Sequence, residues 1–363
     1  MANYNLEKLS VLVVDDDEFS RNTLVSVLRA LKVGKLLIAH DGSEAIQQLK
    51  TAAITAPSPG DCGIDLIMAD WLMLPVSGAM LLRWLRRSEE SPDRYIPFIA
   101  VSGDVSRHTV EEARDLGIND FLTKPYSIST VTQRLEALIE APNHFLHSGA
   151  YFGPDRRKQA LPHPGEERRL ISEEDCEIIT VQKNPDTLNT KAKIWYFHLP
   201  NKLKVKLAPK SVEEEGKIDP KLLRAAEKQL RSRKDDYTTW VQGNVEKLMG
   251  QYTELAKQPK NPWKYYQTIY NIAHELRGQG DTFGYNLITT FGKSLCDYTE
   301  SKHLELDEKL LELIRAHIDG IQAVIREDIK GLGGESGVEL LDILNKAKAK
   351  YARKLAAAGN KYG

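Results

Sequence analysis

Four apolar runs of the sequence are each followed by polar residues that could do chemistry. Three acids follow the first run, and single functional groups follow later ones: Asp15, Asp16 and Asp17, then Asp70, Ser102, and Lys124 with Pro125. Neighbouring carboxylates repel one another, and a hard divalent cation such as Mg²⁺ relieves that repulsion through oxygen ligands. A carboxylate beside Mg²⁺ can attack a phosphoryl group, while a lysine and a hydroxyl bind the phosphoryl oxygens. The residue types therefore indicate magnesium-assisted phosphoryl chemistry.

The elements around these residues alternate in a regular way. Short apolar runs predict five buried strands, at Val11–Val14, Leu36–Ala39, Ile64–Ala69, Phe98–Val101 and Phe121–Leu122. Amphipathic stretches between them predict helices near 18–31, 43–51, 78–88, 105–116 and 127–140. Five β/α units favour an α/β doubly wound, five-stranded parallel sheet, whose sites lie at the carboxyl ends of the strands. Acids at strand ends can also be solvated caps, but several functional types at four strand ends favour a site.

Residues 9–140 resemble a receiver domain of bacterial two-component response regulators, which has a flavodoxin-like fold. The motifs that carry the resemblance are VLVVDDDEFSR, DLIMADWLMLPVSG, AVSGD and DFLTKP. The resemblance implies that Asp70 accepts the phosphoryl group. It also implies a Mg²⁺ site formed by Asp15, Asp16, Asp70 and the backbone carbonyl of Leu72.

The same resemblance assigns roles to the remaining motif residues. Ser102 and Lys124 would sense the phosphoryl group, and Phe121 would be the switch aromatic. One position departs from the family, because Leu74 stands where a proline usually follows the phosphoacceptor, and Pro75 comes next. We expect this change to alter the local loop and leave the chemistry intact.

Composition narrows the classes of function. Lys plus Arg number 50 and Asp plus Glu number 51 among 363 residues, and this net charge of -1 argues against a general binder of nucleic acid or anionic membranes. The cysteines Cys62, Cys176 and Cys296 are far apart and lack metal spacing, which favours a reducing cytosol. No apolar run approaches the roughly 20 residues that span a bilayer. MANYNLEKLS has no signal-peptide core.

The composition and periodicity of the sequence change at two points after residue 142. Residues 143–218 are rich in Pro, Gly and paired arginines, which is typical of a linker, although the arginines could also dock on an acidic partner. Within this segment CEIITVQ, KIWYF and KLKVKL predict short strands. From Asp219, an N-cap followed by Pro220, to residue 358 the pattern is helical and predicts a bundle.

The stretch AHELRGQGDTFGY, Ala273 to Tyr285, is a second candidate for chemistry. The apolar residues of its helix share one direction, and His274 points about 170° away from it. Gly278 follows about 6 Å along the helix axis. We expect an exposed imidazole that can take up a phosphoryl group. Glycine would leave room for a bulky partner, and Arg277 would balance the charge of phosphohistidine.

HELRG resembles the H-x-x-K-G motif of histidine phosphotransfer domains, with Arg277 in place of the lysine, and FGKSLCDYTE is similar to the next helix of that family. The resemblance implies that His274 carries phosphate. The plainer alternative is a surface histidine beside an incidental glycine. HELR is also similar to the phosphoacceptor box of dimerising histidine kinases. Only about 80 helical residues follow it, which leaves no ATP-binding domain, so we expect no autonomous kinase activity.

These patterns together predict a cytoplasmic phosphorelay protein that passes phosphate between an aspartate, Asp70 or that of another receiver, and His274. Its partners would be a sensor histidine kinase, another receiver or a histidine phosphotransfer protein. In the alternative hypothesis the receiver switches a helical adaptor, and His274 is never phosphorylated. Nucleic-acid output has only the basic stretch NKAKAKYARKL in its favour, which is more simply a solvated helix face.

Overall fold

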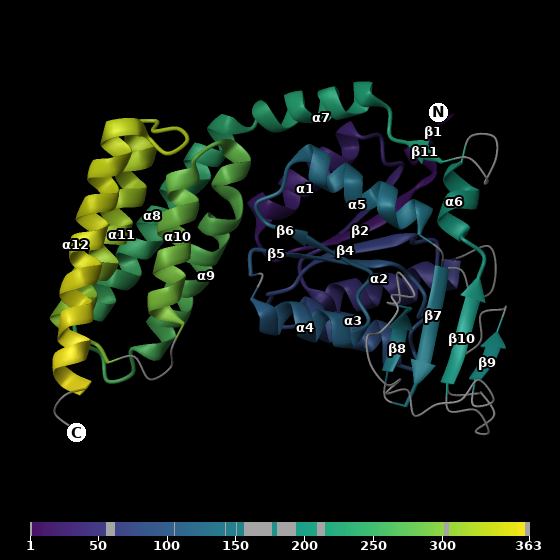
Figure 1. Ribbon diagram of the computed structural model, residues 1–363, viewed down its shortest axis with the longest axis horizontal. Coiled ribbons are helices and arrows are strands. Elements are labelled where there is room, and N and C mark those ends of the chain that lie inside the picture. The colour runs from purple at the N-terminus through teal and green to yellow at the C-terminus, as the bar shows by residue number, and fades with distance from the viewer. Residues whose placement is uncertain are drawn as a thin grey trace, which may run out of the picture. The chain divides into compact units, whose positions relative to one another are not determined.

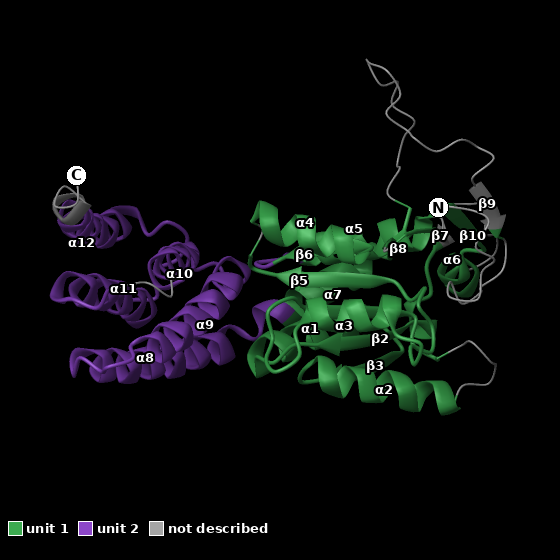
Figure 2. Cartoon of the chain, turned by 90° about the horizontal axis from the view of Figure 1, so that it is seen from below, with its two compact units in different colours: residues 1–123, 128–229 green, residues 124–127, 230–363 purple. Residues whose placement is uncertain are grey.

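The computed structural model describes residues 2–55, 62–104, 106–141, 143–149, 151–155, 176–179, 194–208, 215–300 and 305–359. The chain divides into two compact units (Figure 2). The first contains residues 1–123 and 128–229, and the second contains residues 124–127 and 230–363. The three-part division expected from the sequence, with boundaries after residues 142 and 218, stays a prediction.

A five-stranded parallel sheet organises the first unit, in the order β3-β2-β4-β5-β6. The strands are β2 (Ser10–Val14), β3 (Lys35–Ala39), β4 (Leu66–Asp70), β5 (Phe98–Ser102) and β6 (Asp120–Thr123). One face is covered by α1 (Glu18–Ala30) and α5 (Ile128–Glu140), and the other by α2 (Gly42–Thr55), α3 (Gly78–Arg87) and α4 (Arg107–Leu116) (Figure 1). The predicted doubly wound fold is therefore confirmed.

The local sequence explains how these elements begin and pack. Every residue of β2, β4 and β5 is buried, because helices cover both faces of the sheet. Three helices begin at a polar cap, since Asp17, Ser77 and Ser106 each accept a hydrogen bond from a backbone N–H of the first turn. These caps fix where the chain turns from strand to helix, and Asp17 does so directly beside the predicted acidic site.

A second, four-stranded sheet belongs to the same unit, in the order β8-β7-β10-β9. Its strands are β7 (Asn143–Ser148), β8 (Tyr151–Pro154), β9 (Cys176–Ile179) and β10 (Ile194–Leu199). Phe145, Phe152 and Phe197 pack around Tyr95, with ring centroids 5.0–5.7 Å from it. A Cβ on Gly117 would lie 2.8 Å from the Phe152 carbonyl oxygen, so glycine permits this close approach.

Two of the three short strands predicted in this segment are present, and the third prediction is wrong. CEIITVQ contains β9 and KIWYF contains β10, whereas KLKVKL forms the helix α6 (Lys202–Leu207). Asn201 caps this helix by accepting a hydrogen bond from Lys204 N, and Leu203 and Leu207 form its buried side. In a run this short, alternating apolar residues are compatible with a strand or with a short helix, and the Asn201 cap favours the helix. The paired arginines at 156–157 and 168–169 lie outside the described residues.

The N-terminus is tied to a segment far along the chain. The strand β1 (Ala2–Asn3) pairs in parallel with β11 (Gly216–Lys217), and a 3-10 helix, η1 (Leu6–Lys8), follows β1. The Glu140 carboxylate accepts hydrogen bonds from Tyr4 Oη and from Gly216 N at 3.0 Å, and it pairs with Lys204 at 2.6 Å. One side chain at the end of α5 therefore holds both strands.

The second unit is built from helices. After α7 (Pro220–Arg231), they are α8 (Lys234–Ala256), α9 (Trp263–Gln279), the 3-10 turn η4 (Asp281–Phe283), α10 (Asn286–Thr299), α11 (Glu308–Arg326) and α12 (Gly334–Gly359). The helix α11 packs against α8, α10 and α12, and α9 packs against α8 and α10. The predicted helical region is confirmed, including the N-cap at Asp219. Among the described helices, none is long and apolar enough to cross a membrane.

Two contacts of the bundle core involve α10. A Cβ on Gly292 would lie 2.8 Å from the carbonyl oxygen of Ala273 and the amide nitrogen of Arg277, so glycine lets α10 approach the α9 backbone. His317 of α11 is fully buried, with Nδ1 2.7 Å from Leu313 O and Nε2 2.8 Å from Ser294 Oγ. Because a carbonyl only accepts, Nδ1 carries the proton and the Ser294 hydroxyl donates to Nε2.

Candidate phosphoryl-transfer site

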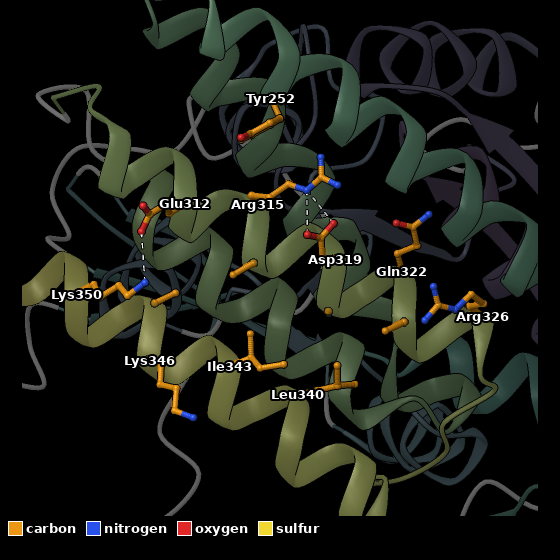
Figure 3. Close-up of a pocket in the computed structure, with 14 residues that line it drawn as sticks. Tyr252, Glu312, Arg315, Asp319, Gln322, Arg326, Leu340, Ile343, Lys346 and Lys350 are labelled. Atoms are coloured by element: carbon orange, nitrogen blue, oxygen red, sulfur yellow. Dashed lines mark hydrogen bonds and ion pairs between the residues drawn. The ribbon is translucent and has the colours of Figure 1, made fainter.

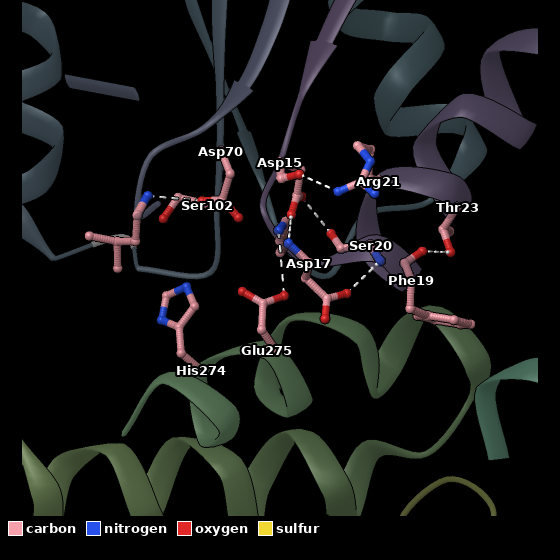
Figure 4. A network of polar contacts seen from close by, with 12 residues as sticks. Asp15, Asp17, Phe19, Ser20, Arg21, Thr23, Asp70, Ser102, His274 and Glu275 are labelled. Carbon is pink, nitrogen blue, oxygen red and sulfur yellow. Dashed lines mark hydrogen bonds and ion pairs between the residues drawn. The ribbon is translucent and has the colours of Figure 1, made fainter. Parts of the chain in front are cut away.

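The parallel sheet brings the predicted strand-end residues of the first unit to one edge. Asp15 follows β2, and Asp70 and Ser102 are the last residues of β4 and β5. These strands are paired in register, with Val14 beside Ala69 and Asp70 beside Val101. Figure 4 shows Asp15, Asp70 and Ser102 projecting from these strand ends. All three side chains are buried. The order of the strands therefore places these three residues at one edge of the sheet, as expected from the sequence.

Asp15 is held by Asp17 and by two residues that sequence reasoning did not single out, Ser20 and Arg21. Its Oδ2 accepts a hydrogen bond from Ser20 Oγ at 2.7 Å, and its Oδ1 accepts one from Asp17 N at 2.9 Å (Figure 4). Arg21 Nη1 donates to the Asp15 backbone carbonyl at 2.7 Å. All of these groups belong to the motif DDDEFSR. Within it, Asp17 followed three residues later by Ser20 is the pattern that indicates a helix cap.

The other two acids are oriented by the loop after β4. Asp70 Oδ1 accepts a hydrogen bond from Leu72 N at 3.0 Å, and Asp16 Oδ2 accepts one from Leu74 N at 3.3 Å. Much of Asp16 is open to solvent, yet partial loss of water around its carboxylate, with repulsion from Asp15 and Asp70, raises its pKa to about 6. Three interacting carboxylates create a local excess of negative charge.

The donor chemistry at this edge fits a hard cation. Carboxylate oxygens and a backbone carbonyl are ligands that Mg²⁺ prefers, and Mg²⁺ commonly keeps several waters in place of protein ligands. After burial, repulsion from Asp15 and Asp70 contributes to the raised pKa of Asp16, and a cation would relieve that repulsion. In the part of the chain that the structure describes, no three His, Cys, Asp or Glu side chains already form a metal-chelating group. The carboxylates accept hydrogen bonds from Ser20 and from backbone amides, which orient them, and each carboxylate has further lone pairs for a cation.

The remaining receiver-type residues have different surroundings. Ser102 Oγ accepts a hydrogen bond from Asp104 N at 3.0 Å, which fixes the turn after β5. Phe121 is partly buried against the hydrophobic core on the α3 side of the sheet. Lys124 follows β6 and is 2 % exposed. Leu72, the candidate carbonyl ligand, keeps a side chain that is 40 % exposed.

The expected exposure of His274 is wrong in this structure. His274 is 3 % exposed, and Gly278 is also buried. The helical projection assumed one packing direction for α9, but α9 packs against both α8 and α10, and the Lys124–Ser127 segment also belongs to this unit. A Cβ on Gly278 would lie 3.2 Å from Lys124 Cδ. Glycine at 278 therefore makes room for a lysine side chain here.

The expected cation beside the imidazole is present. Arg277 Nη2 lies 3.4 Å from His274 Nδ1, and the Tyr270 ring lies 6.2 Å from the imidazole, centroid to centroid. Glu275, the acid next to the histidine, lies 3.8 Å from Lys124 Nζ within the same unit. A guanidinium at this distance could stabilise the negative charge of a phosphoryl group attached to the imidazole.

Comparison with known proteins agrees with the geometry of the first unit. Residues 11–136 match the family described as response regulator receiver domain. This chain is 28% identical over 134 residues to chemotaxis protein CheY-3 of Vibrio cholerae, which is 37% of this chain and 94% of the relative. It is 26% identical over 135 residues to chemotaxis protein CheY of Pseudomonas aeruginosa, 37% of this chain and 99% of the relative. Residues 11–136 thus form a CheY-like receiver domain of two-component signalling.

Two solved structures are similar to the same part of the chain. One is the chemotaxis protein CheY4 of Vibrio cholerae crystallised at low pH, with 23% identity, a TM-score of 0.30, and coverage of 35% of this chain and 96% of that one. The other is the receiver domain of sensor histidine kinase PA1611 of Pseudomonas aeruginosa PAO1, which has a magnesium ion coordinated in its active site cleft. It shows 22% identity, a TM-score of 0.30, and coverage of 35% of this chain and 94% of that one.

Proposed function

We propose that this protein is a phosphorelay component that accepts a phosphoryl group on Asp70 and carries or passes phosphate on His274. The observation that supports the first half best is the shared edge of Asp15, Asp16, Asp70 and Ser102 in a receiver domain. The second half rests on the contact of Arg277 with His274 in a helical bundle. A sensor histidine kinase, another receiver or a histidine phosphotransfer protein would supply or receive the group.

The Asp70 carboxylate acts as the nucleophile in this proposal. One of its oxygens forms a bond to phosphorus as the bond between phosphorus and the donor atom breaks, and the donor keeps the electron pair. The Ser102 hydroxyl would donate a hydrogen bond to one phosphoryl oxygen, and the Lys124 ammonium would pair with another. Because Asp70 and Ser102 are buried, neighbouring groups must move before a donor reaches them. A small donor is thus the more direct first probe.

Asp15, Asp16, Asp70 and the Leu72 carbonyl would hold Mg²⁺. The bound cation would neutralise the charge that develops on the phosphoryl oxygens. Ser20 positions Asp15 for this role through its 2.7 Å hydrogen bond, and the backbone amide of Leu72 orients Asp70.

On His274, an imidazole nitrogen would take the phosphoryl group from an acyl phosphate on aspartate, and the aspartate would recover its carboxylate. Arg277, 3.4 Å from Nδ1, would offset the added negative charge. Since His274 is buried in this structure, this transfer also requires α9 to become accessible. In this proposal the group reaches His274 from a phosphorylated receiver.

Side-by-side labelling tests the receiver half of the proposal. We expect acetyl phosphate with Mg²⁺ to label the full chain and the His274→Gln variant, and to leave Asp70→Asn unlabelled. Chelation of Mg²⁺ should abolish the label. Labelling that persists in Asp70→Asn or with EDTA would remove the receiver half of the proposal.

A second candidate function follows from the burial of His274. In this alternative the receiver switches a helical adaptor that binds a partner, and His274 stays unphosphorylated. If Asp70 is labelled while no phosphorylated receiver ever labels His274, the adaptor function is the correct one. We place the protein in the cytoplasm on the basis of the family resemblance of its receiver domain.

A further inference from the structure

The last helix of the second unit, α12, carries its charges in two blocks. Acidic residues occupy its first half, and basic residues follow in its second half: Glu335, Glu339 and Asp342, then Lys346, Lys348, Lys350, Arg353 and Lys354. Such a helix is complementary to itself when two copies lie antiparallel, because the acidic half of each then faces the basic half of the other. In parallel orientation, like charges would meet.

The outward side of α12 also presents apolar groups. The helix packs on α11 through a narrow stripe that includes the buried Leu344 and Tyr351. On other sides Val338 is 67 % exposed and Ile343 is 57 % exposed. Ten large hydrophobic side chains are exposed among the described residues, and Leu332, Val338, Ile343 and Leu355, four of them, lie in or next to α12. Such a concentration of exposed apolar residues is typical of an interaction surface.

A groove between α11 and α12 adjoins these residues (Figure 3). It has a volume of about 730 Å³ and is bordered by Tyr252 of α8. Leu340 and Ile343 line it from α12, and four basic side chains line it against two acidic ones: Arg315, Arg326, Lys346 and Lys350 against Glu312 and Asp319. A helix with an acidic half fits this balance of charge.

We propose that the chain forms a two-fold symmetric dimer in which α12 of one copy lies antiparallel along α12 of the other, over the α11–α12 groove. Pairing centred on Leu344 places Glu335 opposite Arg353 of the second copy, and Asp342 opposite Lys346. Two-fold symmetry repeats each pair. The Ile343 side chains lie near the centre, where they are shielded from water on both sides. This interface does not depend on phosphorylation of Asp70 or His274.

The size of α12 sets the expected strength of the dimer. Its 26 residues extend about 39 Å, and one helix face of that length buries less than the roughly 800 Å² per partner of a standard interface. We therefore expect a reversible dimer in the micromolar range. Because charge pairs at the surface are screened, its dissociation constant should rise with ionic strength.

Sedimentation velocity of the full chain tests the assembly. From the low micromolar to the submillimolar range, the average mass should rise from 40.9 kDa toward twice that value, and salt should shift the transition to higher concentration. A chain that stays at 40.9 kDa over the whole range overturns the proposal.

Charge reversal tests whether complementary charges on α12 hold the two copies together. Glu335→Lys, Glu339→Lys and Asp342→Lys together make α12 basic throughout, and Lys346→Glu, Lys350→Glu and Arg353→Glu together make it mostly acidic. Each triple variant alone should be monomeric, and an equimolar mixture of the two should recover the dimer. Dimers of either variant alone as tight as wild type, or no recovery on mixing, would contradict the proposed charge pairing between the two α12 helices.

A matched control separates position from net charge. Asp235→Lys, Glu246→Lys and Glu254→Lys change the net charge as much as the first triple variant does, but they lie on α8 and leave the charges of α12 unchanged. This control should dimerise like wild type. Far-UV circular dichroism checks that α12 stays helical. Should a charge variant lose helix, Val338→Ser with Ile343→Ser removes the apolar contribution instead, and at least a tenfold weaker dimer is expected.

Discussion

His317 shows how a single buried residue can control the response of the bundle to pH. Its ring is fully buried, and both nitrogens are already hydrogen-bonded, to Leu313 O and to Ser294 Oγ. Burial lowers its pKa from 6.5 to about 4. A protonated ring would have to give up the bond from the Ser294 hydroxyl, because both nitrogens would then be donors.

We expect acid to destabilise the bundle through this residue. The unfolded chain binds a proton more tightly than the folded one, so the contribution is complete above the unfolded pKa of 6.5 and is lost as the pH falls toward 4. The limit is about 3 kcal/mol of unfolding free energy, with about 2 kcal/mol lost by pH 5. Urea unfolding followed by helical circular dichroism at several pH values measures this loss. His317→Gln should be less stable at pH 7 and depend less on pH, and equal pH dependence of both proteins would refute the assignment.

Part of the candidate site could be predicted from residue types and their spacing in the sequence. Asp15, Asp70 and Ser102 could be predicted to meet because parallel strands put their carboxyl ends at one edge. The contact of Ser20 with Asp15 could not, because it depends on the direction in which α1 leaves its cap. The exposure of His274 was predicted wrongly, because a projection of one helix contains no information about its several neighbours.

At the scale of elements, Arg86 connects the two sheets of the first unit. Its guanidinium donates to the carbonyl oxygens of Gly117, Arg94 and Ile96 at 2.6–3.0 Å, and it lies 5.3 Å from the centroid of the Phe145 ring. Burial lowers its pKa to about 10, so it remains charged at neutral pH. The Arg86 guanidinium donates hydrogen bonds to three carbonyl groups between α3 and β6 and also contacts Phe145 of the second sheet. It therefore holds this segment against the second sheet.

We expect Arg86→Met to destabilise the first unit by about 3–5 kcal/mol, because it leaves buried carbonyl groups without a donor. Urea unfolding monitored by tryptophan fluorescence measures the change. The neighbouring Arg87 is exposed, so Arg87→Met is a matched control that should stay within about 0.5 kcal/mol of wild type. Equal effects of the two substitutions would show that Arg86 is not the connection.

Element types were easier to predict from the sequence than element partners. The five strands of the receiver sheet and the helices after Asp219 follow from local periodicity and caps. The second sheet could not be predicted in full, since β7 pairs with β10 about fifty residues later and no local pattern specifies that pairing. The segment KLKVKL illustrates the ambiguity of short runs, because its six residues are compatible with either structure until Asn201 is recognised as a cap.

At the scale of the whole molecule, the two phosphate-carrying residues of the proposal can be placed on different chains. We expect a His274→Gln chain labelled on Asp70 to pass its phosphate to unlabelled Asp70→Asn chains, where it would appear as an acid-labile, base-stable phosphate. Transfer should depend on Mg²⁺ and on encounter between chains. Gel separation of a size-tagged recipient measures the result. If the label returns only to water, transfer between these two residues is excluded, and His274 needs another receiver as its donor.

The pairing of β1 with β11 has a consequence for the synthesis of the protein on the ribosome. The strand partner of Asn3 is Lys217, which is added to the chain about 210 residues after it. At translation rates of about 5–20 residues per second, that delay is roughly 10–40 s. The parallel sheet can form during this interval, whereas Tyr4 and Glu140 must wait for Gly216 to complete their hydrogen bonds. The strand β1 is therefore among the last parts of the first unit to reach its final partner.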